Sequence, residues 1–166
     1  MAERKPLVLD VDGTFLRTDL LYEAFWAGLG RAPVATLGAV LRHVTRPAAL
    51  KHALAGIARL RVDLLPTHPG IAALADAARA EGREVILASA SDRTQVAELA
   101  RSHDLSPRIY ASRPDHNLKG ARKAAALVQD FGARGFDYAG NEAVDRPIWD
   151  VADHAIVVGR HPAIRA

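Results

Sequence analysis

The sequence contains no cysteine, and aromatic residues make up only 5% of its 166 positions. The absence of thiols excludes disulfide bonds, cysteine nucleophiles, and zinc or iron–sulfur centres held by cysteine. The seven histidines are scattered and form no HExxH pattern, which argues against a zinc hydrolase. No serine lies in a G-x-S-x-G segment, so a serine hydrolase with a nucleophile elbow is not indicated.

Long apolar runs are also missing. The nearest approach to a membrane span, residues 20–41, is interrupted by Glu23 and Arg31 and is therefore not a continuous apolar segment of spanning length. The amino-terminal MAERKP leads into an apolar run within a few residues, which leaves no room for a signal peptide. We therefore expect a cytoplasmic domain without a transmembrane segment of its own.

The composition is that of a soluble globular protein, with 49% hydrophobic and 25% charged residues. The net charge of +3 is mild, and nucleic-acid binding is not expected because it usually requires a more concentrated basic face. Most of the positive charge lies in one block. Residues 17–69 contain seven basic and three acidic side chains, a net charge of +4, so the rest of the chain is nearly neutral.

The stretch LVLDVDGTFL, residues 7–16, organises the rest of the chain. Its apolar start is typical of a central parallel strand, which is covered on both faces and shows no polar alternation. Asp10 and Asp12 follow at once, with Gly13 and Thr14 directly after them. Open α/β sheets bind their ligands just beyond the carboxyl ends of the strands, so we expect these polar residues to belong to a site.

From residue 70 onwards, strands alternate with helices. We expect strands at residues 84–88, 108–111, 136–139 and 155–158, and helices at 71–80, 92–103 and 119–131. This alternation predicts a doubly wound, Rossmann-like α/β fold with a parallel five-stranded sheet. Apolar residues at helical spacing from Leu20 to Leu29, interrupted by Gly28, Gly30 and Pro33, indicate a first helix, and two further helices are expected at about 34–44 and 48–60. Together they predict a small helical cap inserted after the first strand. The predicted division is a core of residues 1–16 and 70–166 and a cap of residues 17–69.

Chemically informative residues follow the predicted strands or open a helix. They are Asp10, Asp12, Ser89, Lys119, Asn141 and Asp145. Two carboxylates, a hydroxyl, a lysine and a further oxygen-rich pair are what phosphoryl transfer through a covalent intermediate requires. A carboxylate can attack phosphorus only if the repulsion between the two anions is offset, which Mg²⁺ on oxygen ligands and a lysine can do. A second acid must protonate the leaving oxygen and later activate water.

The segments DVDGTF, Ser89 after EVILA, Lys119 in NLKG, and GNEAVD together resemble the four motifs of the haloacid dehalogenase (HAD) superfamily, in that order. The longer matches, such as DVDGTFLRTDLL and NLKGARKAAALV, are similar to a bacterial branch often fused ahead of a UbiA-type membrane prenyltransferase. The resemblance spans nearly the whole chain. It implies a HAD-type phosphatase that depends on Mg²⁺.

Carried over to this sequence, the resemblance implies a role for each motif residue. Asp10 would be the nucleophile and a metal ligand, and Asp12 the general acid and base, which also offers its backbone carbonyl to the metal. Thr14, Ser89 and Lys119 would bind the phosphoryl group. Asn141 and Asp145 would complete the metal shell. The superfamily commonly has aspartate where Asn141 stands, so we expect a functional magnesium site of reduced affinity.

The sequence leaves the substrate open. We expect a phosphate monoester, and the resemblance together with the basic cap extends this to a polyprenyl-linked or sugar phosphate. A phosphotransferase or mutase using the same residues is one alternative. Another is a weakly catalytic domain that docks on a prenyltransferase, at the inner face of a membrane. The cap itself is either a small helical unit with a solvated basic face or, with Tyr22, Phe25 and Trp26, a surface that meets an anionic membrane.

Overall fold

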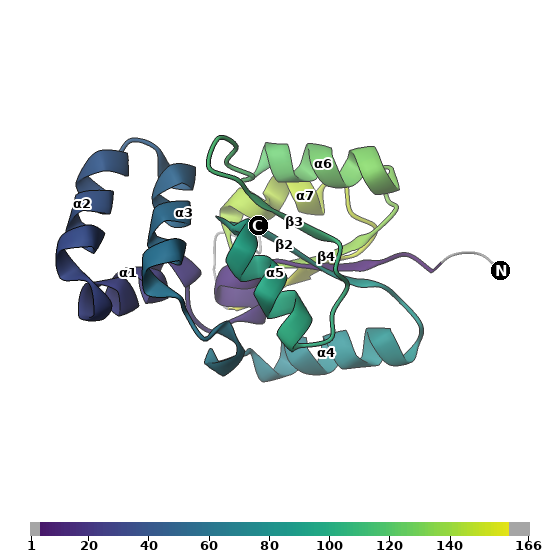
Figure 1. Cartoon of the computed structure of the whole chain (residues 1–166). Coiled ribbons are helices and arrows are strands. Elements are labelled where there is room, and N and C mark those ends of the chain that lie inside the picture. Colours follow the sequence, from purple (N-terminus) through teal and green to yellow (C-terminus); the bar gives the residue numbers. More distant parts are fainter. Residues whose placement is uncertain (1–3, 160–166) are drawn as a thin grey trace.

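The computed structural model describes residues 4–159. They form a parallel sheet with helices on both faces, and a group of three further helices lies past the carboxyl ends of the strands (Figure 1). The predicted core range also includes residues 1–3 and 160–166, which lie outside the described part of the chain. The insert after the first strand is helical, as the sequence predicts. Its division from the core at residues 17–69 stays a prediction.

Five strands form the sheet in the order β3-β2-β1-β4-β5, and every neighbouring pair is parallel. They are β1 (Leu7–Leu9), β2 (Val85–Asp92), β3 (Ile109–Ser112), β4 (Asp137–Gly140) and β5 (Ala155–Val157). The chain runs outward from β1 to β3 and then returns to β4 on the other side of β1. This reversal of strand order places a crevice at the carboxyl end of β1, where open α/β sheets bind their ligands.

Both faces of the sheet are covered, which explains the unbroken apolar pattern of β1. Leu7 and Leu9 pack toward α4 (Pro69–Ala80) and α5 (Arg93–Ser102). Val8 points to the opposite face, toward α6 (Ala121–Phe131) and α7 (Arg146–Trp149). All three side chains of β1 are fully buried, so the position of the residues that follow is fixed by the core.

Two element boundaries differ from the predicted ones near the site. The second strand does not end at residue 88 but continues to Asp92, with an irregular register between Ala88 and Asp92, and pairs Asp92 with Ser112 of β3. Helix α6 begins at Ala121 rather than at Lys119, because Gly120 has φ of 55°, which is not a helical conformation.

The insert consists of α1 (Leu20–Arg31), α2 (Pro33–His43) and α3 (Pro47–Ala58), followed by the short turn η2 (Val62–Leu64). Proline is the first residue of α2 and α3, a position where its missing N–H costs nothing. Ala24, Leu54 and Ala58 form a small apolar core of their own. We call these three helices the cap, and Figure 1 shows them standing beside the sheet at its carboxyl end.

Candidate active site

A tight turn directly after β1 holds the two acids of the DVDGTF segment. The turn, η1 (Val11–Phe15), is closed by a hydrogen bond of 3.1 Å from the Phe15 amide to the Asp10 carbonyl. Gly13 has φ of 73°, a conformation that glycine adopts without strain. A Cβ at Gly13 would also collide with the side-chain amide of Asn141. Glycine is therefore required here both by the backbone and by the close approach of the loop after β4.

Asp10 is paired with a buried lysine of α6. The Lys123 Nζ lies 2.8 Å from Asp10 Oδ1 and 3.7 Å from an oxygen of Asp145. Only 3% of Lys123 is exposed, so its ammonium is a fixed charge inside the site rather than a solvated one. Burial nevertheless raises the pKa of Asp10 to about 7, although the Lys123 ammonium acts in the opposite direction.

Lys123, Tyr138 and Asp145 form a continuous hydrogen-bond chain next to Asp10. The Lys123 ammonium donates to the Tyr138 hydroxyl over 3.0 Å, and that hydroxyl donates to Asp145 Oδ1, also over 3.0 Å. The other Asp145 oxygen accepts from the backbone amide of Glu142 over 3.2 Å. Burial and the neighbouring carboxylates raise the pKa of Tyr138 well above its ordinary value, so Tyr138 remains a neutral donor that orients Asp145.

Asp12 is held by hydroxyl groups of β2. One of its oxygens accepts from Ser89 over 3.0 Å and from Ser91 over 2.6 Å, and the other accepts from the Leu20 amide over 2.7 Å. Burial raises the pKa of Asp12. A carboxyl group with a raised pKa is better able to hold a proton and give it to a leaving oxygen.

Thr14 links the first motif to the loop after β4. Its hydroxyl lies 3.3 Å from Asp10 Oδ2 and 3.1 Å from Asn141 Oδ1. Because a hydroxyl has one proton, it can donate to only one of these oxygens at a time. Thr14 is fully buried. Its hydroxyl lies between Asp10 and Asn141 and so connects the turn to the loop after β4.

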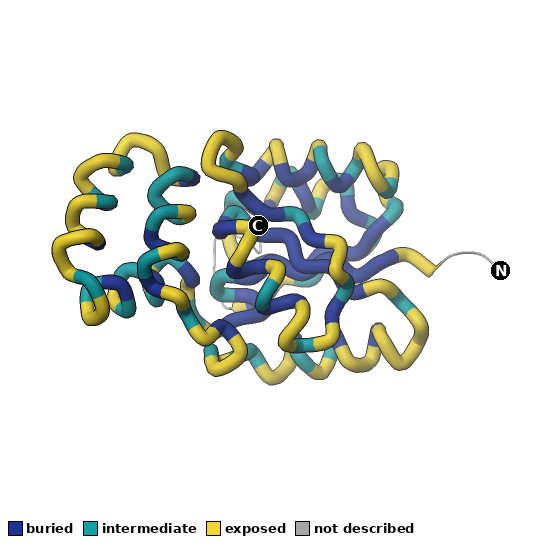
Figure 2. Tube along the Cα trace, viewed as in Figure 1, coloured by how far each residue is buried: buried dark blue, intermediate teal, exposed yellow. Residues whose placement is uncertain are grey.

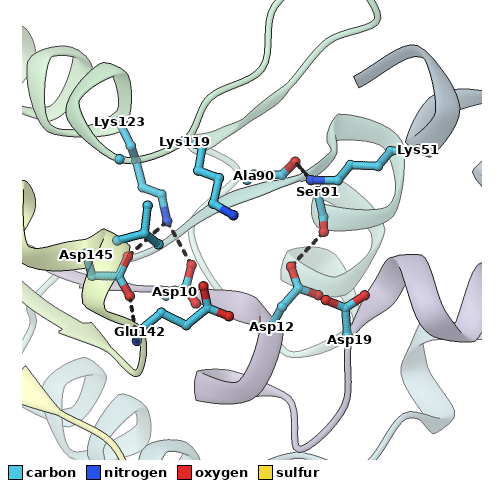
Figure 3. Close-up of a pocket in the computed structure, with 12 residues that line it drawn as sticks. Asp10, Asp12, Asp19, Lys51, Ala90, Ser91, Lys119, Lys123, Glu142 and Asp145 are labelled. Carbon is cyan, nitrogen blue, oxygen red and sulfur yellow. Dashed lines mark hydrogen bonds and ion pairs between the residues drawn. The ribbon is translucent and has the colours of Figure 1, made fainter. Parts of the chain in front are cut away.

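A cavity of about 80 Å³ opens above these groups. Figure 3 shows carboxylates and lysines from the core and the cap converging on it, with the Lys119 side chain extending toward its centre. Its charged lining residues are Asp10, Asp12, Asp19, Glu142, Asp145, Lys51, Lys119 and Lys123. Lys51 comes from α3 of the cap, and its Nζ donates to the Ala90 carbonyl over 2.6 Å. The cap thus forms one wall of the cavity.

The charges of this lining fit a divalent cation. Five carboxylates face three lysines, and the carboxylates of Asp12 and Asp145 both act to raise the pKa of Asp10. A cation would relieve this uncompensated repulsion. The acidic lining residues offer carboxylate oxygens, which are among the ligands that Mg²⁺ prefers. The donor chemistry and the charge therefore suit Mg²⁺, but within residues 4–159 these carboxylates are not already gathered as three ligand atoms around one point.

The predicted site residues converge, but they do not all face the cavity. Asp10, Asp12, Asp145 and Lys119 line it. Ser89, Thr14 and Asn141 instead hold Asp12 and the turn through the hydrogen bonds described above. Ser91 and Lys51 line the cavity but carry no motif signal in the sequence.

Lys123 is the site residue that sequence reasoning missed. It is buried on the same side of α6 as Ala124 and Leu127. The sequence signal for its role is therefore a single lysine on the apolar face of the predicted helix. Burying a lysine ammonium without a partner costs much free energy. A lysine on an apolar helix face therefore indicates an ion pair inside the protein.

A second group of ionisable residues lies at the opposite end of β4. Asp137, Asp153 and His154 are, within residues 4–159, the one set of three potential His, Cys, Asp or Glu ligands that gather closely enough for a metal. Arg83 bonds to Asp137 and Lys5 to Asp153. These cations already balance both carboxylates, so the group is a salt-bridge network at the amino-terminal edge of the sheet.

Comparison with known proteins identifies one curated relative at the sequence level. The uncharacterized protein y4nM of Sinorhizobium fredii is 32% identical over 154 residues, which is 93% of this chain. The match covers 30% of the length of y4nM, so the chain corresponds to less than a third of that protein. No protein-family model matches the sequence.

Solved structures give a clear result for the fold. A protein of unknown function from Bordetella pertussis superposes with a TM-score of 0.74 at 16% identity, over 99% of this chain and 94% of that one. A substrate-bound phosphoserine phosphatase superposes with a TM-score of 0.69 at 12% identity, over 99% of this chain and 90% of that one. A HAD family hydrolase from Salmonella enterica serovar Typhi superposes with a TM-score of 0.67 at 16% identity, over 97% of this chain and 65% of that one.

Within residues 4–159, no helix is long and apolar enough to cross a membrane. The parallel sheet and the helical insert after β1 agree with these superpositions. The chain has the HAD-like fold.

Proposed function

We propose that this chain is a phosphohydrolase that cleaves phosphate monoesters through a phosphorylated Asp10. The observation that carries the proposal is the buried Asp10 at the carboxyl end of β1, paired with Lys123 and facing a cavity with Asp12 on its wall. The likeness to a phosphoserine phosphatase and a HAD family hydrolase in fold supports it. The resemblance of the four sequence motifs supports it independently.

In the first step, the Asp10 carboxylate bonds to phosphorus, and the bond between phosphorus and the ester oxygen breaks. Asp12 gives its proton to the departing alkoxide, so the alcohol leaves neutral. In the second step, Asp12 takes a proton from water as the water oxygen bonds to phosphorus. The bond between phosphorus and Asp10 breaks, which releases inorganic phosphate and restores both acids.

The side chains around Asp10 have distinct tasks in this scheme. Lys123 keeps Asp10 oriented, and Lys119 at the open side of the cavity meets the phosphoryl oxygens. Ser89 and Ser91 hold Asp12 toward the ester oxygen. Mg²⁺, when bound, would offset the repulsion between carboxylate and phosphate. Asp10 and Asp145, with the Asp12 carbonyl, would hold it, and Asn141 would join them by turning its side chain from Thr14 toward the cavity.

The cavity limits which part of a substrate it can enclose. At about 80 Å³, it is far smaller than the roughly 300 to 1,000 Å³ of pockets that enclose drug-sized ligands. It has room for a phosphoryl group and little else. We therefore propose that the alcohol part of the substrate extends past the cap, as a sugar or a polyprenyl chain would. The names of the relatives reported above do not mention a prenyltransferase, so that association stays a prediction from the motifs.

The test is phosphate release from a panel of phosphate monoesters, lipid-linked ones included, with and without Mg²⁺. Asp10→Asn should abolish release, whereas Asp150→Asn, an exposed acid of the core, should leave it unchanged. Phosphate recovered on an added alcohol instead of in solution would identify a phosphotransferase. Folded protein that releases no phosphate from any ester, with Mg²⁺ present, would refute the proposal.

A further inference from the structure

The cap carries most of the exposed large hydrophobic side chains within residues 4–159. Eight large hydrophobic side chains are exposed within residues 4–159, and six of them lie between residues 22 and 44. They are Tyr22, Trp26, Val34, Leu37, Leu41 and Val44. In Figure 2, α2 is coloured as exposed along most of its length, at the end of the cap farthest from the sheet. Concentrated apolar exposure of this kind marks an interaction surface.

Four of these residues follow one another along α2 and the residue after it. Val34, Leu37, Leu41 and Val44 have spacings of three, four and three positions, which places them on one side of a helix. The side of α2 that faces the cap interior is marked by Thr36, which is fully buried against α1. We call the four exposed residues the α2 stripe. Val34 and Leu41 are 85% and 81% exposed, so the stripe has no partner within the described chain.

The surroundings of the stripe are basic. Between Leu20 and Ala58, the cap helices and their connections contain Arg31, Arg42, Arg46 and Lys51 but only one acid, Glu23. Lys51 turns into the active-site cavity, and the Glu23 carboxylate accepts a hydrogen bond from Thr18. The three exposed arginines therefore lie close in sequence to the stripe without a carboxylate that bonds to them.

We propose that the α2 stripe docks on the surface of an anionic phospholipid bilayer. A single helix presents a convex ridge, which suits the plane of a membrane interface, where an apolar helix face is buried at the level of the headgroups. Arginines beside such a face add attraction to anionic lipids. Tyr22 and Trp26 on α1 carry apolar rings with polar tips, the combination found at membrane interfaces. This inference does not depend on the phosphatase activity.

The test is co-sedimentation of the full chain with vesicles of phosphatidylcholine alone or mixed with phosphatidylglycerol. We expect binding to the mixed vesicles. Leu37→Gln/Leu41→Gln should weaken it at least about tenfold, because two exposed leucines no longer enter the interface. Leu64→Gln, which alters an exposed leucine outside the cap helices, is the matched control and should bind like the natural chain.

A second arm isolates the charge. Arg42→Gln and Arg46→Gln should each weaken binding to the mixed vesicles about fivefold, whereas Arg101→Gln, an exposed arginine of α5, should have no effect. Circular dichroism confirms that each variant is folded. The proposal fails if mixed vesicles do not sediment the chain, or if the leucine variant binds unchanged. It also fails if light scattering shows a dimer that the leucine variant dissolves, since the stripe would then belong to a second copy.

Discussion

Lys119 and Lys123 both reach the active-site region, but the structure gives them different environments. Lys119 is exposed at the mouth of the cavity, whereas Lys123 is buried against Asp10 and Asp145. The motif resemblance assigns the phosphate-binding lysine to Lys119. The structure adds a second lysine, which is buried and paired with two carboxylates of the site.

This difference can be measured. Lys123→Met should lower the free energy of unfolding by about 3 kcal/mol, because it leaves buried carboxylates without their cation. Lys119→Met should change stability by less than about 0.5 kcal/mol, yet both variants should release phosphate slowly. Urea denaturation monitored by circular dichroism gives the stabilities. Asp10→Asn added to Lys123→Met should restore part of the loss, and equal stability of the two single variants would contradict the assignment.

Asn141 offers a direct test of the magnesium site. Asn141→Asp adds a negative charge beside Asp10, so Mg²⁺ should bind about tenfold more tightly. The same charge should destabilise the metal-free protein, because like charges then repel one another in a buried site. Calorimetric titration with Mg²⁺, together with thermal unfolding in a chelator, measures both effects. Asn117→Asp, in the loop before α6, should change neither, and unchanged affinity in Asn141→Asp would remove Asn141 from the ligand set.

At the scale of elements, the turn η1 depends on a glycine for two separable reasons. Gly13 and Gly82 have nearly the same backbone conformation, with φ of 73° and 74°. A Cβ at Gly82 meets open space, but one at Gly13 meets the Asn141 amide. The pair therefore separates the cost of the backbone conformation from the cost of the close contact.

We expect Gly82→Ala to lower stability by about 1–2 kcal/mol, the cost of a left-handed conformation for a residue with a Cβ. Gly13→Ala should cost about 1–3 kcal/mol more, because the neighbouring side chain must move. Denaturant unfolding of both variants provides the comparison. Adding Asn141→Ala to Gly13→Ala should recover most of the extra loss, and if it recovers none, the contact is not its cause.

The start of helix α6 explains why the sequence did not identify Lys123 as the lysine that pairs with Asp10. Lys119 and Lys123 are four positions apart, so the choice between them depends on where the helix begins. The sequence predicts a start at Lys119, but Gly120 takes a positive φ and the helix starts two residues later. That conformation accompanies close packing of Gly120 against Val144, a contact between distant segments that no local pattern reveals.

At the scale of the whole molecule, the parallel five-stranded sheet and the place of the helical insert were predictable from the sequence, whereas the strand order comes from the structure. The apolar residues of β1 are buried on both faces, and the polar residues that follow β1 and β4 meet at the carboxyl ends of these strands. What could not be predicted is which polar groups face the cavity. Ser89 and Ser91 both bond to Asp12 because β2 continues past Ala88, and Lys51 arrives from the cap. The first feature depends on the irregular register at the end of β2, and the second on how the cap packs against the core.

The contact between α3 of the cap and β2 of the core leads to a kinetic prediction. Lys51 and His52 of α3 contact the core side by side, at Ala90 and Asp92, but only Lys51 lines the active-site cavity. Lys51→Met should raise KM for a phosphate ester about tenfold with little change in kcat, because it removes a cation that helps to bind the substrate. His52→Ala should have a smaller effect. Steady-state kinetics distinguishes the two, and equal increases in KM would mean that the contact between cap and core matters rather than the charge.

The central place of β1 also has a consequence for synthesis on the ribosome. This strand is made first, but its two neighbours begin only at Val85 and Asp137, and 113 positions separate Asp10 from Lys123. A growing chain thus carries its nucleophile long before the cation that accompanies it. Products of premature termination that lack β4 leave an edge of β1 unpaired and apolar, which is the kind of surface that chaperones and proteases detect.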